Sequence, residues 1–309
     1  MRANRPAELV VGSVQLGLAY GAANVSGKPG RETALRLVRR AADAGVGQFD
    51  TARAYGDAEE RLGDALAGRR AIAITKLSPL TELEPDASRN QVRTAVDASI
   101  LASCAALQRP KLDCLLLHRA GHITAHDGAI WQRLIEHVEE GTIAKLGVSV
   151  QSPAEALSAL SSAHVEHIQL PFNLLDWRWR EAGVIDAIRA RKHLVVHARS
   201  VFLQGILATA DAGVWPRIAG VNARALIAWL GETAHGLSRE TAADLCLSYA
   251  RGQDWIDGVV VGQETIEQLD ANLRLATRPP LSPQDCERIE AARPRVPEAL
   301  LDPAQWPKT

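Results

Sequence analysis

The chain has 309 residues, of which 47% are hydrophobic and 23% charged, and its formal net charge is −1. This composition is typical of a globular protein with enough apolar material for a large core, which argues against disorder. The near-zero net charge argues against a nucleic-acid-binding surface or a polybasic membrane patch, and by elimination it favours work on a small molecule.

Residues 1–8 contain no apolar segment of the kind found in a signal peptide, and no apolar run of about 18 residues follows anywhere in the chain. The four cysteines are widely spaced and form no CxxC pair. This pattern predicts reduced core thiols rather than a disulfide framework or a zinc site. We therefore expect a cytoplasmic protein without a membrane span and without a bound metal.

The first predicted elements follow one another closely. An apolar stretch over residues 9–16 predicts a strand, and the turn-rich segment 18–30 predicts a loop. Apolar residues recur at helical spacing over residues 31–44, where Gly45 would form the C-terminal cap. A second strand follows and ends at Asp50.

The alternation of helix and strand then repeats along the chain. Further helices are predicted over residues 57–67, 89–107 and 128–140, and further strands over residues 71–76, 112–118, 143–150, 167–170, 193–198 and 258–261. No hairpin turn joins consecutive strands, so they are expected to be parallel and buried on both faces. Residues 208–239 predict a long loop with one helix, and the Pro-rich tail 293–309 is expected to cover the barrel surface.

Eight parallel strands separated by helices predict a (β/α)8 barrel, formed as a single domain by residues 1–309. An open doubly wound sheet is the competing fold. Its dinucleotide-binding fingerprint, GxGxxG, would open a helix after the first strand, but residues 13–17 read SVQLG. The barrel is therefore the expected fold, and its functional residues should lie at the C-terminal ends of the strands.

Three successive predicted strands end in ionisable residues, Asp50, Lys76 and His118, and Tyr55 lies five positions after the first of them. Neighbouring parallel strands lie about 4.8 Å apart, so these side chains can converge at the barrel mouth. A phenol is a weak acid at neutral pH, and a lysine ammonium beside it favours the phenolate. Asp50 would hold Lys76 charged, Tyr55 would act as general acid, and neutral His118 would orient the substrate oxygen.

Each of these residues also has an ordinary structural explanation. An aspartate at a strand end commonly caps the next helix, a lysine there is commonly solvated, and a histidine commonly satisfies a core hydrogen bond. Their occurrence on three successive strands favours a catalytic group over three independent structural roles. Arg53, which lies between Asp50 and Tyr55, is expected to form a salt bridge within the loop rather than a substrate contact.

Several stretches occur in an order and context typical of one family. They read GSVQLG at 12–17, FDTARAYG at 49–56, TK at 75–76, DCLLLH at 113–118, LGVS at 146–149, QLPFN at 169–173 and GQE from 262, continuing to Asn272. On these stretches the chain resembles the aldo-keto reductases. The resemblance implies that Asp50, Tyr55, Lys76 and His118 form a catalytic tetrad for hydride transfer between a nicotinamide cofactor and a carbonyl carbon.

The resemblance also implies a cofactor that lies extended across the barrel mouth without a Rossmann domain. Ser149 and Gln169 would bind the nicotinamide carboxamide, and Arg199 or Ser200 would lie beside the nicotinamide or the pyrophosphate. The adenosine end would meet residues of the last loop and helix, namely Gly262, Gln263, Gln268 and Asn272. The helix that begins near Thr265 offers free backbone N–H groups for a phosphate, although Thr265 has the alternative role of a simple cap.

The chain departs from the pattern of the family at three places. Val150 stands where many members have an asparagine, and HARS at 197–200 stands where many have a tyrosine that stacks on the nicotinamide. Gln268 replaces an arginine that often binds the 2′-phosphate of NADP, and Glu264 would repel that phosphate. Arg274 is a candidate to compensate, so NADP(H) is the expected cofactor and NAD(H) remains open.

Two other functions fit parts of the sequence. In a metal-dependent barrel hydrolase, histidines such as His118, His122 and His197 would join Asp50 at the mouth, but the first strand lacks a ligand pair and a lysine beside Asp50 would repel a cation. A cofactor-sensing subunit on the same fold would bind the cofactor and a partner protein without turnover.

The expected substrate is a small aldehyde, ketone or sugar, and the simplest expectation for the assembly is a monomer. Residues 15–21 and 199–205 resemble a bacterial branch of the aldo-keto reductases that is linked to sugar metabolism.

Overall fold

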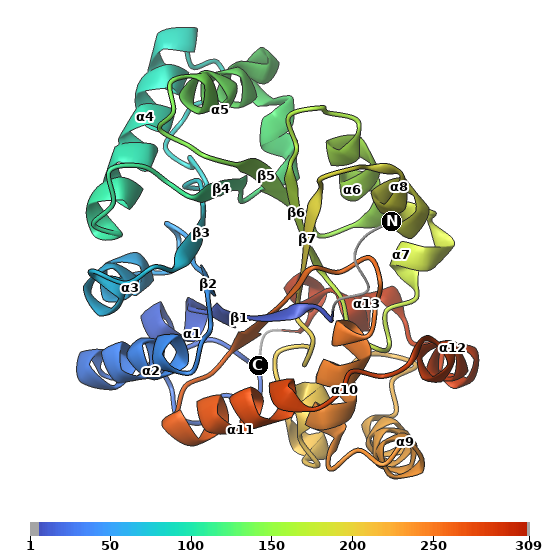
Figure 1. Ribbon diagram of the computed structural model, residues 1–309. Coiled ribbons are helices and arrows are strands. Elements are labelled where there is room, and N and C mark those ends of the chain that lie inside the picture. The colour runs from blue at the N-terminus through green and yellow to red at the C-terminus, as the bar shows by residue number, and fades with distance from the viewer. Residues whose placement is uncertain (1–5, 308–309) are drawn as a thin grey trace.

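The computed structural model describes residues 6–307 and contains a closed barrel of eight parallel strands in the order β1 to β8, with β8 paired to β1 (Figure 1). This confirms the predicted fold. The strands are β1 Glu8–Gly12, β2 Gln48–Asp50, β3 Ile72–Lys76, β4 Cys114–Leu117, β5 Leu146–Ser149, β6 His167–Pro171, β7 Val195–Arg199 and β8 Gly258–Gly262.

Helices surround the strands, as Figure 1 shows. Those that follow β1 to β4 are α1 Val14–Gly17, α2 Arg31–Asp43, α3 Ala58–Leu66, α4 Arg89–Ala106 and α5 Ala129–Glu139. Those that follow β5 to β7 are α6 Pro153–Leu160, α7 Arg178–Glu181, α8 Val184–Ala190, α9 Ala223–Gly236 and α10 Ala242–Arg251. After β8 come α11 Ile266–Thr277, α12 Pro283–Ala292 and α13 Glu298–Leu301. Short 3-10 helices cover Ala120–Ile123, Ala125–Gly128, Ile206–Ala208, Ala212–Val214 and Pro303–Gln305.

Alternation along each strand separates two apolar regions. A large core fills the space between the strands and the helices, and it includes Phe49, Leu115 and Leu117. A small separate cluster, to which Ile74 and Leu116 belong, fills the barrel interior. Because successive residues of a strand face opposite sides, the inward series continues upward to the polar residues at the strand ends.

The first predicted strand is too long. It ends at Gly12, and Val14–Gly17 form one helical turn instead of continuing the strand. A Cβ atom on Gly17 would lie 1.7 Å from the backbone oxygen of Tyr55. Such a contact is impossible, so the turn after β1 can rest directly on the loop of Tyr55 only because residue 17 is glycine.

Other predicted boundaries differ by a few residues. Strand β4 begins at Cys114 and stops one residue before His118, β5 occupies the C-terminal half of the predicted span 143–150, and β7 begins later and includes Arg199. The irregular region 208–239 contains helix α9, which is capped by the side chain of Asn222. These differences leave the chemically important residues at or beside the strand ends.

The described part of the C-terminal tail packs against the loop after β6. The Trp177 indole donates a hydrogen bond to the backbone oxygen of Val296 at 3.2 Å, and Leu300 and Leu301 are buried. Gln151, at the end of β5, donates to Asp302 at 3.0 Å. Residues 308–309 of the tail lie outside the described residues, as do residues 1–5 of the segment considered for a signal peptide.

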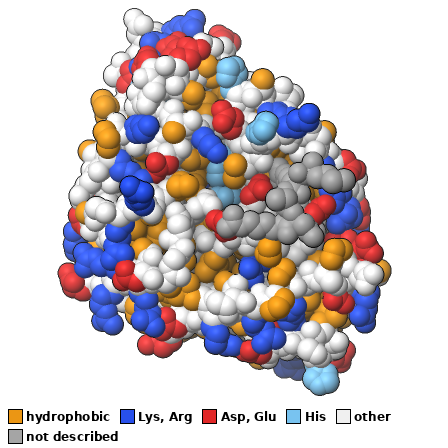
Figure 2. Space-filling view, viewed as in Figure 1, with side chains coloured by type: hydrophobic (Ala, Val, Ile, Leu, Met, Phe, Trp, Pro, Cys, Tyr) orange, Lys and Arg blue, Asp and Glu red, His pale blue; other side chains and the backbone are white. Residues whose placement is uncertain are grey.

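Acidic and basic side chains are intermixed over the face seen in Figure 2, in keeping with the small net charge. Within residues 6–307, no helix combines the length and the apolar character that a membrane crossing requires.

Candidate active site

The centre of the site is a buried ion pair between the ends of β2 and β3. The Lys76 ammonium donates to both carboxylate oxygens of Asp50 at 2.8 Å and to the backbone oxygen of Thr51 at 2.9 Å. Burial alone lowers the pKa of Lys76, but the Asp50 carboxylate outweighs it and the pKa is raised. Lys76 is 1% exposed and therefore stays charged although it is almost completely withdrawn from water.

Tyr55 and His118 complete the group of four that the sequence predicted. The Lys76 nitrogen lies 5.1 Å from the centre of the Tyr55 ring. The rings of Tyr55 and His118 meet edge to face with their centres 5.8 Å apart. Tyr55 is only half buried, so its side chain is accessible from the barrel mouth. The structure thus brings Asp50, Tyr55, Lys76 and His118 together, and their chemical roles remain a prediction.

His118 is held in its neutral form. Burial, followed by the positive charge of Lys76, lowers the pKa of His118 to about 4. Its Nδ1 atom is buried and has no hydrogen-bond partner among residues 6–307. A neutral imidazole at this position can exchange a hydrogen bond with a substrate oxygen without carrying a charge.

The loop that carries Tyr55 is fixed by two glycines that face each other. A Cβ atom on Gly56 would lie 2.6 Å from the backbone oxygen of Gly17, just as one on Gly17 would overlap the backbone of Tyr55. Gly56 also has φ +58°, a conformation that favours glycine. This close backbone contact ties the Tyr55 loop to the turn after β1.

Arg53 forms the loop salt bridge that the sequence predicted, and its partner is Glu59 at the start of α3. Glu59 is 1% exposed, and its second carboxylate oxygen accepts a hydrogen bond from the Thr75 hydroxyl at 2.6 Å. Thr75 directly precedes Lys76 on β3. The Arg53–Glu59–Thr75 chain therefore holds the loop after β2 against the next strand.

Gln169 makes a contact that the sequence did not predict. Its amide nitrogen donates to Asp50 at 2.7 Å, which joins β6 to the ion pair across the barrel. Its amide oxygen is buried and has no partner within the described residues. Ser149 lies beside Gln169 in the register of β5 and β6 and is also buried. One end of Gln169 is thus occupied, while the other is available to a ligand next to Ser149.

Arg199 ends β7 and reaches across β6 to the end of β5. Its guanidinium donates to the Gln151 side chain at 2.7 Å, to the Val150 backbone oxygen at 3.2 Å and to the Ser200 hydroxyl at 3.4 Å. Ser200 has φ +61° and begins the loop after β7. Gln151 was not predicted as a site residue, and only the spatial proximity of β5 and β7 reveals it.

The predicted adenosine end lies at β8 and the start of α11. The side chain of Gln15 lies directly over Gly262, where a Cβ atom would approach Gln15 Oε1 to 2.1 Å. Gln263 is 2% exposed, and its amide nitrogen has no partner in the part of the chain that the structure describes. Gln15 was missed by sequence reasoning, because the contact depends on the pairing of β1 with β8.

Helix α11 carries the other residues predicted at this end. Thr265 accepts a hydrogen bond from the Gln268 backbone at 3.2 Å, and the Gln268 side chain accepts one from the Glu264 backbone at 2.8 Å. Thr265 therefore caps the helix, as the alternative interpretation had it. Burial raises the pKa of Glu264. Asn272 lies further along the same helix and is 9% exposed.

Arg274 does not compensate for the missing arginine at position 268. It lies in the last turn of α11, about 13 Å along the helix axis from Thr265. There it forms an ion pair with Glu240. The predicted role of Arg274 at the cofactor phosphate is therefore not supported by its position.

Two histidines and a cysteine occupy the barrel interior. The rings of His167 and His197 meet at 4.3 Å, and His167 Nδ1 lies 3.2 Å from the Cys114 sulfur. Burial lowers the pKa of His197 to about 4 and that of His167 well below its usual value. Over residues 6–307 no three metal-binding side chains are placed to hold an ion, and Lys76 already occupies both oxygens of Asp50.

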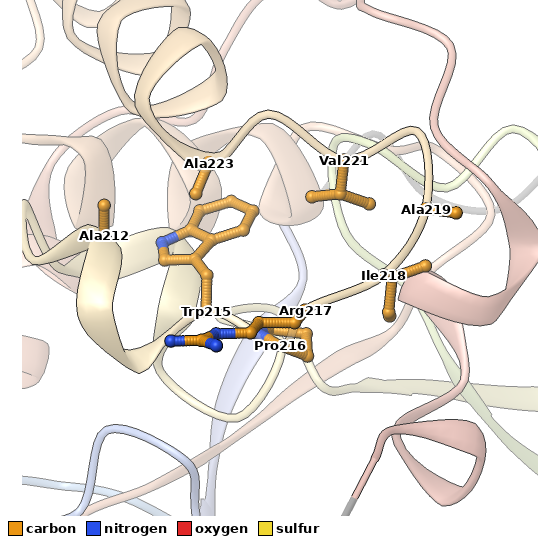
Figure 3. Close-up of a pocket in the computed structure, with 8 residues that line it drawn as sticks. All are labelled: Ala212, Trp215, Pro216, Arg217, Ile218, Ala219, Val221 and Ala223. Carbon is orange, nitrogen blue, oxygen red and sulfur yellow. The ribbon is translucent and has the colours of Figure 1, made fainter.

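A surface pocket of about 420 Å³ lies between the 3-10 helix Ala212–Val214 and the start of α9 (Figure 3). Trp215 and aliphatic side chains form most of its wall, and Arg217 contributes its one ionisable group. None of the four residues Asp50, Tyr55, Lys76 and His118 lines this pocket, so it lacks the groups for proton transfer.

Comparisons with known proteins identify the family and the fold. The model of the aldo/keto reductase family matches residues 8–294. A curated relative, the 6-dehydroglucose reductase of Novosphingobium aromaticivorans, is 36% identical over 129 residues, which cover 38% of this chain and 41% of the relative. The matched part thus spans less than half of that relative's length.

Solved structures show the same fold at lower identity. The holo form of the aldo-keto reductase AKR11C1 from Bacillus halodurans has a TM-score of 0.76 and 23% identity, with 94% of this chain and 93% of that chain covered. A Pseudomonas aeruginosa structure assigned to the aldo-keto reductases has a TM-score of 0.60 and 21% identity, with 88% and 90% covered.

Proposed function

We propose that this chain, which belongs to the aldo/keto reductase family, transfers hydride between a nicotinamide cofactor and the carbonyl carbon of a small aldehyde, ketone or sugar. Tyr55 is the general acid in reduction and the general base in oxidation. The observation that carries the proposal is the Lys76 ammonium, which is saturated by Asp50 and Thr51 and lies against the Tyr55 ring.

The charges around Tyr55 support proton transfer by its hydroxyl. In reduction the carbonyl oxygen gains negative charge, and Tyr55 gives it a proton to form the alcohol. The phenolate that remains on Tyr55 is stabilised by the nearby ammonium of Lys76, which Asp50 holds in place. Neutral His118, whose ring meets the Tyr55 ring edge to face, donates a hydrogen bond to the same oxygen and adds no charge that would hinder proton donation.

The cofactor fits the polar groups that remain at the mouth. Reduced nicotinamide supplies the hydride. The buried amide oxygen of Gln169 and the amide nitrogen of Gln263 have no partner among the described residues, and a dinucleotide offers complementary groups to both. Ser149 and Gln169 would hold the carboxamide end, and Gly262 to Asn272 the adenosine end. The capped start of α11 keeps backbone N–H groups for a phosphate.

The sequence expectation of NADP(H) loses one argument in the structure, since Arg274 is bound to Glu240 at the far end of α11. Burial raises the pKa of Glu264, which lies beside the start of α11. Both NADPH and NADH therefore belong in the assay. The curated relative is named a reductase of 6-dehydroglucose, which supports sugars with an oxidised carbon as the first substrates to test.

The decisive experiment compares Tyr55→Phe with the wild type across a panel of aldehydes, ketones and oxidised sugars, using both cofactors. We expect turnover to fall by roughly 10²–10⁴-fold while the dissociation constant of the cofactor stays within about twofold. Tyr20→Phe is the matched control, because Tyr20 is a second tyrosine near Tyr55, and its pKa is raised mainly by burial. A much smaller loss is expected there.

The opposite results are equally clear. If the wild type binds a nicotinamide cofactor tightly but turns over no carbonyl in the panel, the chain is a cofactor-binding protein and the enzymatic proposal is wrong. If Tyr20→Phe loses as much activity as Tyr55→Phe, the general acid has been assigned to the wrong residue.

A further inference from the structure

Arg199 is a cation at the barrel mouth whose hydrogen-bond acceptors are all neutral. They are the Gln151 amide, the Val150 backbone and the Ser200 hydroxyl. In the described part of the chain it has no carboxylate partner, whereas Arg53, on the loop after β2, is paired with Glu59. A partly buried arginine is ordinarily paired with an anion, so its charge here calls for a functional explanation.

The guanidinium lies over the pair of residues proposed to hold the nicotinamide carboxamide. Arg199 belongs to β7, and it contacts Val150 and Gln151, which directly follow β5. Because β6 lies between β5 and β7, the side chain crosses above β6. Ser149 and Gln169 are register neighbours on β5 and β6 directly beneath this span. A nicotinamide held by those two residues would therefore lie close to the charge of Arg199.

The other charges at the mouth do not cancel that of Arg199. Asp50 and Lys76 neutralise each other, and His118 is neutral. Arg119, next in sequence to His118, is exposed to solvent. The charge of Arg199 also reaches the catalytic group, since the pKa of His118 is lowered by burial, then by Lys76 and further by Arg199. Among the described residues, no carboxylate is paired with Arg199, and the exposed Arg119 adds a second positive charge that acts more weakly on His118.

We propose that Arg199 makes this site bind the reduced form of the nicotinamide cofactor more tightly than the oxidised form. The inference rests on the proposed function of the mouth as a cofactor site. The oxidised nicotinamide ring carries a positive charge and the reduced ring carries none, while the rest of the cofactor is the same in both forms. Repulsion by Arg199 therefore acts on one form only.

The expected size of the effect follows from Coulomb's law. At an effective dielectric constant of about 20, two like unit charges a few ångströms apart repel strongly enough to change a ratio of dissociation constants by roughly tenfold or more. A tenfold change in this ratio corresponds to about 30 mV in the potential of the bound couple. After carbonyl reduction, the repulsion would speed the release of the oxidised cofactor.

The test measures four dissociation constants by protein fluorescence at low salt, for NADPH, NADP⁺, NADH and NAD⁺. In the wild type we expect the reduced form to bind at least about tenfold more tightly than its oxidised partner. Arg199→Gln removes the charge but keeps a hydrogen-bonding amide, and it should reduce this ratio by about tenfold or more. Arg199→Lys keeps the positive charge and should preserve most of the difference in affinity between the two forms.

Arg189→Met is the matched control, because Arg189 lies on the outer helix α8 and is paired with Asp254. It should leave both ratios unchanged. The inference is overturned if the Arg199→Gln variant binds both forms and its ratio of oxidised to reduced dissociation constants stays within twofold of the wild-type ratio. Equal weakening of both forms would overturn it for the same reason. If the wild type binds none of the four cofactors, the proposed function itself fails, which is a distinct result.

Discussion

The two sides of the barrel mouth differ in how completely the chain satisfies its own polar groups. On the side of β2 and β3, every N–H of the Lys76 ammonium is used, by Asp50 and Thr51. On the side of β6 and β8, the Gln169 oxygen and the Gln263 nitrogen are buried without a partner among residues 6–307. The Lys76 ammonium is thus fully hydrogen-bonded without a ligand, whereas Gln169 and Gln263 offer polar atoms to one.

This difference has a physical reason. The groups that move a proton must be in place before a substrate arrives, and a buried ion pair supplies that order at the cost of desolvating two charges. Groups that hold a ligand gain nothing from pairing with each other, since each such bond would have to be broken on binding. Gln169 belongs to both sides, because its nitrogen holds Asp50 while its oxygen is free.

Lys76→Met tests the completed side and should have the largest effect. It leaves the Asp50 carboxylate buried without its cation, which should lower the free energy of unfolding by roughly 3–5 kcal/mol. Turnover should fall by about 10²–10⁴-fold in the molecules that fold. Urea denaturation and steady-state kinetics measure the two losses. Lys111→Met, which removes an exposed charge, is the control; comparable losses in both variants would contradict the role given to the ion pair.

His197→Leu tests the barrel interior, which lies below both sides of the mouth. Its pKa of about 4 in the folded state lies below the ordinary value of 6.5, so the unfolded chain binds a proton between these values and the folded chain does not. Stability should therefore be lost as the pH falls from 6.5 towards 4, by about 2 kcal/mol at pH 5 for this residue. Neither ring nitrogen has a partner within the described residues, so leucine breaks no hydrogen bond.

The measurement is urea denaturation at pH 7 and pH 5. His197→Leu should lose about 2 kcal/mol less stability than the wild type between these two values. The exposed His164, replaced by leucine, serves as the control and should follow the wild type. An identical pH dependence in wild type and His197→Leu would show that His197 is protonated as easily in the folded protein as in the unfolded chain.

Gln263→Leu tests the unsatisfied side and should have the smallest effect. It removes an amide whose nitrogen has no partner in the described structure, so the folded protein should keep its stability within about 1 kcal/mol. Cofactor affinity should fall by about tenfold, in keeping with one lost hydrogen bond. Isothermal titration gives the affinity, with the exposed Gln132→Leu as control. Unchanged affinity would remove Gln263 from the cofactor site.

Sequence analysis could predict those parts of the site that depend on the residues of a single strand and its end. Each of β2, β3 and β4 is a short apolar run that ends at or next to Asp50, Lys76 or His118, and alternation along a parallel strand fixes which way those side chains face. The barrel follows from repeated strand and helix signals without hairpins.

The parts that could not be predicted depend on contacts between distant segments. The bond from Gln169 to Asp50 joins residues 119 positions apart, and the Gly17 contact with Tyr55 depends on how closely two loops approach. The length of β1 was overestimated for a local reason, since apolar residues 14 and 16 suit a strand as well as a helical turn. Arg274 was considered for the cofactor phosphate because it is close to Glu264 in sequence, but nearly three helical turns separate the two residues.

The closure of the barrel has a consequence for how the molecule is made. Glu8 on β1 pairs with Gly258 on β8, 250 positions later, so the seam between these strands joins the most distant parts of the sheet. Contacts between such distant segments form slowly, and chains are synthesised from the N-terminus at about 5–20 residues per second. The residues proposed to transfer the proton are thus synthesised within the first 118 positions, while Gly262 and Gln263, proposed to bind the cofactor, emerge many seconds later. A nascent chain should acquire its acid before it can hold a coenzyme.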